Sequence, residues 1–188
     1  MTNSRPRGDV RPPKINADEK TTLLTFLDYL RESVAAKLSG LTDEQARTPG
    51  VPSGTSLLWL VKHLAAVEYD WFAWAYAGAP GPFRDYRLRP AEEDTVESVL
   101  AAYREAAQRS NEIALACDDL DRPGVRSLRE HEPAPSLRWV LVHMVEETAR
   151  HAGPPSSQSR SESRGPAATS ARTRSSPACS RASHAPKE

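Results

Sequence analysis

Apolar residues recur every three or four positions in four separate stretches of the chain, a spacing typical of helices that bury one face. No stretch alternates apolar and polar residues for long enough to predict a β-strand. Helices that have no sheet to cover must bury their apolar faces against each other. The sequence therefore predicts an all-α fold, an antiparallel four-helix bundle. The predicted helices cover residues 18–40, 56–77, 94–117 and 137–151.

Residues that favour helix starts define three of these stretches. The second helix is expected to begin at about Ser56, Ser136 is expected to cap the fourth helix, and Asp94 is expected to cap the third together with Glu97. The connection over residues 78–93 is rich in Pro and Gly and long enough to pass over the bundle. We therefore expect one long crossover between the second and third helices.

The two ends of the chain differ in composition from the rest. Residues 154–188 contain no Val, Ile, Leu, Met, Phe, Trp or Tyr, and ten of these thirty-five residues are Ser. Such a segment cannot bury enough apolar surface to offset the entropy lost on ordering. Residues 1–17 also lack a hydrophobic pattern. The sequence predicts a folded bundle over residues 18–153 between disordered N-terminal and C-terminal tails.

Charge and cysteine content exclude several classes of protein. Residues 1–153 carry nineteen Lys or Arg against twenty-three Asp or Glu, which argues against nucleic-acid binding as the main function. The two cysteines offer neither a disulfide framework nor a Cys-rich zinc site, and this fits a reducing cytoplasm. No stretch approaches the ~18 apolar residues of a membrane span. We expect a cytoplasmic protein with no membrane partner.

Three polar residues fall on the inward faces of the second and fourth helices. His63 lies about 60° from the centre of the apolar face of its helix, on the flank of that face. His151 falls in the middle of the apolar face of the fourth helix, and Glu147 lies one turn earlier on its edge. Residues four apart on a helix direct their side chains to one point, so this pair can chelate an ion. His63 would supply a third ligand from the facing helix.

Two imidazoles and one carboxylate without a thiolate are typical of catalytic zinc, because they leave a coordination position open. The same donor set also suits Fe(II), Ni(II) or Mn(II). An alternative interpretation needs no metal: Glu147 could pair with Arg150 or Arg104, and the two histidines could bond to backbone or water. His143, one turn before Glu147, would be a fourth ligand or, as its position favours, a residue that supports the ligands from behind.

Two segments of the sequence resemble the DinB-like metalloprotein superfamily, in its actinobacterial branch associated with mycothiol. They are residues 56–63, Ser-Leu-Leu-Trp-Leu-Val-Lys-His, and residues 136–153, which end in Glu-x-x-x-His-Ala-Gly. The resemblance implies a four-helix bundle over about residues 18–153 and a metal held by His63, Glu147 and His151. Much of the superfamily has His where Glu147 stands. Mycothiol-dependent maleylpyruvate isomerases share the Glu.

The resemblance further implies chemistry on mycothiol, a low-molecular-weight thiol, with an electrophilic small molecule as the second substrate. A thiol bound to zinc loses its proton near neutral pH, and its thiolate could form a conjugate or promote an isomerisation. Trp59, Trp71 and Trp74 are expected to line the substrate pocket, although tryptophans at helical spacing are also common in cores. The sequence names no catalytic residue besides the ligands. The alternative function is a non-catalytic, stress-associated metal-binding bundle.

The sequence departs from the superfamily after Gly153, where the last helix usually continues for two or three turns. Here the chain changes to Pro-Pro and then to a Ser-, Arg-, Ala- and Pro-rich segment. An out-of-frame translation of GC-rich DNA would have this composition, so we expect that the tail is derived from a frameshift. The last helix would then be truncated, and the apolar surface left exposed would favour a homodimer.

Overall fold

The computed structural model describes residues 12–50, 54–85 and 89–153. Within these ranges the chain is helical and has no β-strand, which confirms the predicted all-α fold. The predicted disordered C-terminal tail and most of the N-terminal one lie outside the described residues. None of the described helices is both long and apolar enough to cross a lipid bilayer.

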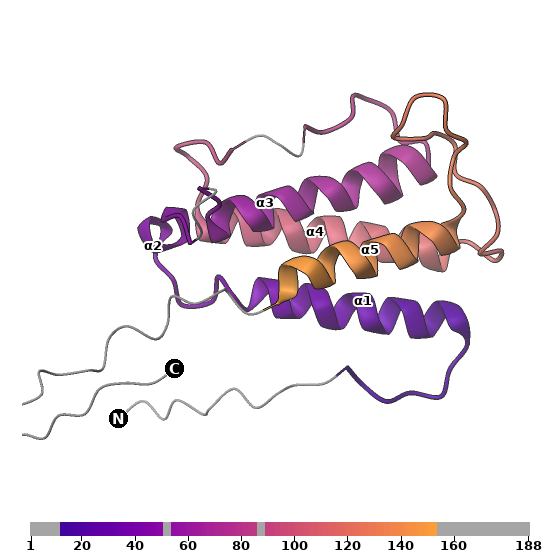
Figure 1. The fold of residues 1–188 in the computed structure, drawn as a ribbon, viewed down its shortest axis with the longest axis horizontal. Coiled ribbons are helices and arrows are strands. Elements are labelled where there is room, and N and C mark those ends of the chain that lie inside the picture. The colour runs from indigo at the N-terminus through magenta and orange to yellow at the C-terminus, as the bar shows by residue number, and fades with distance from the viewer. Residues whose placement is uncertain (1–11, 51–53, 86–88, 154–188) are drawn as a thin grey trace, which may run out of the picture. The chain divides into compact units, whose positions relative to one another are not determined.

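The bundle consists of four long helical segments and one short helix (Figure 1). The third segment has two parts, because α3 continues without a break into the π-helix η1. The bounds are α1 Glu19–Ala35, α2 Asp43–Arg47, α3 Leu57–Glu68, η1 Tyr69–Tyr76, α4 Val96–Leu115 and α5 Leu137–Ala152.

Side-chain caps begin the helices largely as predicted. The hydroxyls of Ser56 and Ser136 accept hydrogen bonds from the third residue of α3 and of α5. The prediction for α4 was wrong: its cap is Thr95, which forms a reciprocal capping box with Ser98. Asp94 cannot serve because its carboxylate already accepts hydrogen bonds from the Lys62 ammonium and from the backbone N–H of Ala91.

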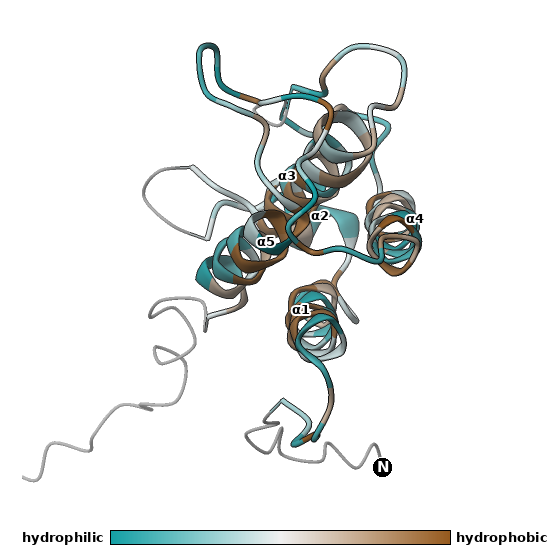
Figure 2. Cartoon of the chain, turned by 90° about the vertical axis from the view of Figure 1, so that its right-hand side faces the viewer, coloured by the Kyte–Doolittle hydropathy of each residue, from teal (hydrophilic) through white to brown (hydrophobic). Residues whose placement is uncertain are grey.

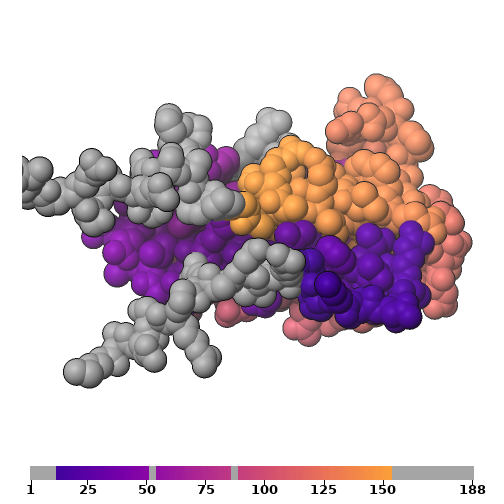
Figure 3. Space-filling view, turned by 60° about the horizontal axis from the view of Figure 1, so that its bottom comes forward, coloured from indigo at the N-terminus to yellow at the C-terminus, as the bar shows by residue number. Residues whose placement is uncertain are grey.

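Helices α1 and α5 run in one direction along the bundle, and α3 and α4 run in the opposite direction. Glu19 and Arg138, at the starts of α1 and α5, form an ion pair, so these two helices are parallel and lie side by side (Figure 3). Lys62 near the start of α3 contacts Asp94 just before α4, so this pair is parallel as well. The predicted crossover makes α3 and α4 parallel. The antiparallel arrangement holds for α1 with α4 and for α3 with α5.

Buried apolar side chains form two clusters in the interior, and the long helices of the bundle carry both hydrophobic and hydrophilic residues along their length (Figure 2). One cluster includes Leu27 of α1 and Val67 of α3, and the other includes Val34 and Leu64 of the same two helices. Each fully buried side chain of this size contributes about 1.5–3 kcal/mol relative to an exposed one. On α1 the change from one cluster to the other falls between Leu27 and Val34, and on α3 it falls between Leu64 and Val67.

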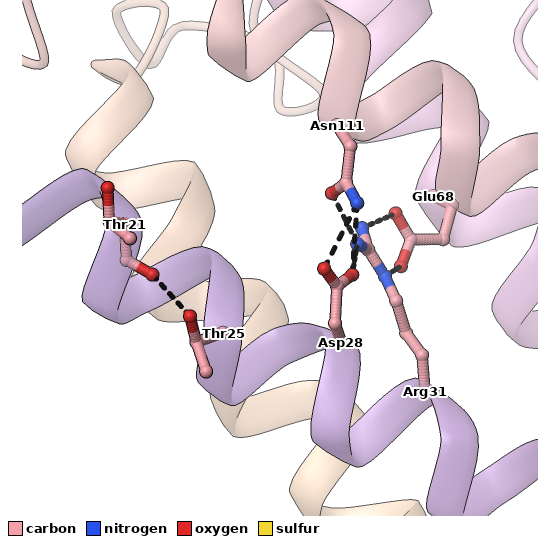
Figure 4. Close-up of polar contacts among 6 residues, drawn as sticks. All are labelled: Thr21, Thr25, Asp28, Arg31, Glu68 and Asn111. Atoms are coloured by element: carbon pink, nitrogen blue, oxygen red, sulfur yellow. Dashed lines mark hydrogen bonds and ion pairs between the residues drawn. The ribbon is translucent and has the colours of Figure 1, made fainter. Parts of the chain in front are cut away.

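A buried ion pair lies beside that boundary (Figure 4), because Arg31 falls between Leu27 and Val34 on α1 and Glu68 directly follows Val67 on α3. The guanidinium of Arg31 in α1 donates to both carboxylate oxygens of Glu68 in α3, at 2.7 and 2.6 Å. Its remaining nitrogen donates to Asp28 and to Asn111 of α4. The side chain of Glu68 is fully buried and that of Arg31 is 5% exposed. The network joins three helices, and bidentate geometry of this kind fixes orientation as well as distance.

The π-helix η1 follows directly after Glu68. In a π-helix the backbone bonds run from residue i to i−5, as from the N–H of Ala77 to the carbonyl of Phe72, and the side chains rotate relative to an α-helix. The C-terminal carbonyls of η1 find partners outside the helix, because the Arg126 guanidinium donates to the carbonyl of Trp74 and the backbone N–H of Arg126 donates to that of Ala75. π-Helical turns are rare and are often found at functional sites.

The buried pair gives a first prediction. Arg31→Met leaves Glu68 as a buried carboxylate without its cation, so the free energy of unfolding should fall by about 3–5 kcal/mol. Urea denaturation followed by circular dichroism measures this change. The matched control is Arg109→Met, which removes an exposed pair with Glu112 and should cost less than about 0.5 kcal/mol. Equal small losses in both variants would contradict the role given to Arg31.

Candidate metal centre

His63, Glu147 and His151 meet between α3 and α5, which pack antiparallel. Glu147 Oε1 lies 3.4 Å from His63 Nε2 and 3.2 Å from His151 Nε2. One ligand atom from each of the three residues lies within 4.8 Å of the other two. Their side chains are 15%, 17% and 27% exposed, so the group is largely shielded and still reachable from solvent. The structure thus brings together the three residues that the sequence predicted as ligands.

The spacing of these atoms fits a single ion. A tetrahedral zinc with bonds of about 2.1 Å holds neighbouring ligand atoms about 3.4 Å apart. The two contacts of Glu147 Oε1, at 3.4 and 3.2 Å, are close to this length and lie at or just beyond the long end of the range for N–H···O hydrogen bonds. With three protein ligands a fourth tetrahedral position is left for a water or a substrate.

The protonation states also suit a cation. Burial alone would raise the pKa of Glu147, but hydrogen bonds and charge from His63 and His151 outweigh it, so the pKa of Glu147 is lowered. Burial lowers the pKa of His151 against the opposing effect of the Glu147 carboxylate. An anionic carboxylate and a neutral imidazole at neutral pH are the forms that ligate a metal.

The interpretation without a metal predicted that Glu147 pairs with an arginine. In the structure, Arg150 pairs with Glu146 on the exposed side of α5. Arg104 lines a groove between α4 and residues 38–43, and both hydrogen-bond contacts of Glu147 are to imidazoles. An arginine therefore does not take the place of the ion.

His143 lies one turn before Glu147, among aromatic rings. Its ring stacks on Trp139, with centroids 5.0 Å apart, and meets the edge of Trp71 at 4.7 Å. Burial lowers the pKa of His143. The structure gives His143 no hydrogen bond to the three candidate ligands, so any support it lends them would act through packing and charge.

The three predicted pocket tryptophans occupy different places. Trp71 lines a cavity of about 270 Å³ that also contains His63 and Glu147. Trp59 lies beside the His63 ring at 6.0 Å, outside that lining. Trp74 packs against Phe83 and under the guanidinium of Arg126, and so supports the cavity wall indirectly, because Phe83 is part of the lining.

The cavity also contains residues that the sequence analysis missed. The carboxyl group of Asp70 and the side chains of Val67, Phe83, Leu128 and Arg129 line it. Asp70 follows His63 by seven positions, a spacing that places both on one side of a helix, so the pattern could have indicated it. A larger groove, of about 670 Å³, lies between η1 and α4 and contains none of the three candidate ligands.

Comparison with known proteins agrees with the site geometry. The sequence model of the mycothiol S-transferase family matches residues 22–154, which include all three candidate ligands. The chain belongs to the mycothiol S-transferase family. This confirms the resemblance to the mycothiol-associated DinB-like branch, over nearly the range expected from the sequence. No curated protein matches the chain.

Removal of metal tests the centre of this mycothiol S-transferase family member. An ion that binds only the folded state stabilises it, so EDTA should lower the melting temperature by roughly 5–10 °C where metal was present at about 100 times its Kd. His63→Ala should lose this shift because it lacks a ligand, whereas His143→Ala should keep it. Equal shifts in the wild type and His63→Ala would remove His63 from the ligand set.

Proposed function

We propose that the protein is a zinc-dependent transferase that joins mycothiol to an electrophilic small molecule in the cytoplasm. The observation that carries the proposal is the convergence of two imidazole nitrogens and one carboxylate oxygen at the edge of a cavity, in a member of this family. The donor set holds a divalent ion and leaves a coordination position free for the sulfur of the thiol.

A bound zinc ion would lower the pKa of the thiol and so supply a thiolate near neutral pH. His63, Glu147 and His151 would each bind the ion through one side-chain atom. The apolar side chains of Val67 and Phe83 line the cavity beside these residues and offer apolar surface to a bound substrate.

The overall reaction balances without an oxidant or a reductant. The S–H bond of the thiol breaks and its proton passes to solvent, and a new S–C bond forms to the electrophilic carbon. If the electrophile carries a leaving group, that group departs with the bonding electron pair. If it is an activated double bond, the neighbouring carbon takes a proton.

The test is consumption of mycothiol with a bimane electrophile by the protein carrying one zinc per chain. The wild type should form the conjugate, lose activity on chelation and regain it with zinc. Glu147→Gln replaces an anionic ligand by a weaker neutral one, so metal content and rate should both fall, the rate by about 10-fold or more. A folded, fully metallated wild type that forms no conjugate would favour the non-catalytic metal-binding bundle.

A further inference from the structure

Asp70, in the first turn of η1, is a buried carboxyl group with only one of its oxygens bonded. The residue is 1% exposed, and its Oδ1 accepts a hydrogen bond of 2.9 Å from the backbone N–H of Arg84. Its Oδ2 has no hydrogen-bond partner among the described residues. The same side chain lines the cavity that contains His63 and Glu147.

Among the described residues, no cation pairs with this carboxyl group. The guanidinium of Arg84 lies over the Tyr69 ring, 4.0 Å from its centroid, and that of Arg129, on the opposite wall, pairs with Glu132. The other charged or titratable groups around the cavity and beside Asp70 are His63, His143, Glu147 and Asp85.

Burial changes the pKa of Asp70. Desolvation raises the pKa of Asp70 to about 6, against the lowering effect of the Arg84 N–H and charge. At neutral pH the group is therefore an ionised acceptor with one oxygen unused. A buried ionised carboxylate with an unpaired oxygen destabilises the folded protein when no ligand is bound. Glu68 avoids this cost through its bidentate pair with Arg31.

The distance between Asp70 and the candidate metal ligands defines how long a ligand must be to reach both. His63 and Asp70 are seven residues apart on one continuous helical segment, which corresponds to about 10 Å along its axis. Val67 lies between them on the same side and lines the cavity. A ligand with its sulfur at the metal needs roughly the length of three extended residues to reach Asp70.

We propose that Asp70 recognises the thiol substrate at the end of the cavity away from the metal, where its free oxygen accepts a hydrogen bond from a hydroxyl or amide N–H of that substrate. This inference rests on the proposed function. Asp70 thereby selects thiols that carry hydrogen-bond donors about 10 Å from the sulfur, and it disfavours short thiols. A site built around a buried acceptor discriminates strongly against ligands that leave this acceptor unpaired.

The test compares Asp70→Asn with the wild type in binding two thiols by calorimetry, without an electrophile. The probes are mycothiol, which carries sugar hydroxyls, and N-acetylcysteine methyl ester, which shares the reactive end and lacks the sugars. Asn keeps the shape and can still accept from the Arg84 N–H, but it presents an N–H₂ donor where Oδ2 was. The Kd for mycothiol should rise about 10-fold or more, and the Kd for the short thiol should stay within about 2-fold.

Asp118→Asn, an exposed carboxylate changed in the same way, is the matched control and should alter neither Kd. Zinc content of Asp70→Asn should equal that of the wild type. Equal Kd values for mycothiol in the wild type and Asp70→Asn would overturn the role of Asp70 while leaving the transferase intact. So would an unchanged Kd with a lower kcat, which would make Asp70 a proton carrier. A wild type that binds mycothiol without conjugating it would contradict the proposed transferase activity and leave the role of Asp70 in binding intact.

Stability without ligand gives a second readout. Because the folded-state pKa of Asp70 is raised above its ordinary value of 3.8, its ionisation destabilises the folded protein increasingly between about pH 4 and pH 6, and fully above that range. Asp70→Asn should therefore melt at a higher temperature than the wild type at pH 8, and this gain should nearly vanish at pH 4. A lower melting temperature of the variant at pH 8 would show that Asp70 is a structural group and would overturn the proposal.

Discussion

The bidentate contact between Arg31 and Glu68 is the interaction on which the arrangement of the bundle depends. Two charges removed from water are tolerated only when each has good partners, so the ion pair restricts how α1 can be placed relative to α3 across the bundle. Asn111 extends the same constraint to α4. With α3 held in this way, the face that carries His63 is directed toward α5, and the ligands on α5 can meet it.

Three largely buried carboxyl groups in the bundle differ in the partners that stabilise them. Glu68 has a guanidinium and is a structural residue. Glu147 has two imidazoles at distances that suit an ion shared by all three. Asp70 has one backbone N–H and an unused oxygen. Because the cost of burying a carboxylate falls with each good partner, the least satisfied of the three is the one most available to a ligand. The π-helix helps to produce this difference, since it starts one residue before Asp70.

Much of the fold and the meeting of the three candidate ligands could be predicted because both depend on spacing within a helix. The apolar stripes gave four helices, and the interval between Glu147 and His151 brought two side chains to one point. The pairing of Arg31 with Glu68 could not be predicted, since it joins residues 37 positions apart whose register is set only by packing. The cap of α4 was missed for a related reason: Asp94 is a good capping residue that a lysine on another helix engages first. Nothing local in residues 69–76 signals a π-helix.

The position of His151 couples the metal site to the end of the bundle. His151 lies in the last turn of α5, where backbone carbonyls have no partners within the helix. Among the described residues, one hydrogen bond anchors this end of the helix, from the Lys37 ammonium to the carbonyl of Gly153. A metal ligated by His151 adds a second anchor, and this one leads to α3 through His63. Helix ends fray at a low free-energy cost, so the ligand set is complete only while the last turn of α5 is formed. Binding of the ion and ordering of this turn therefore stabilise each other, which makes metal affinity sensitive to whatever sequence follows Gly153.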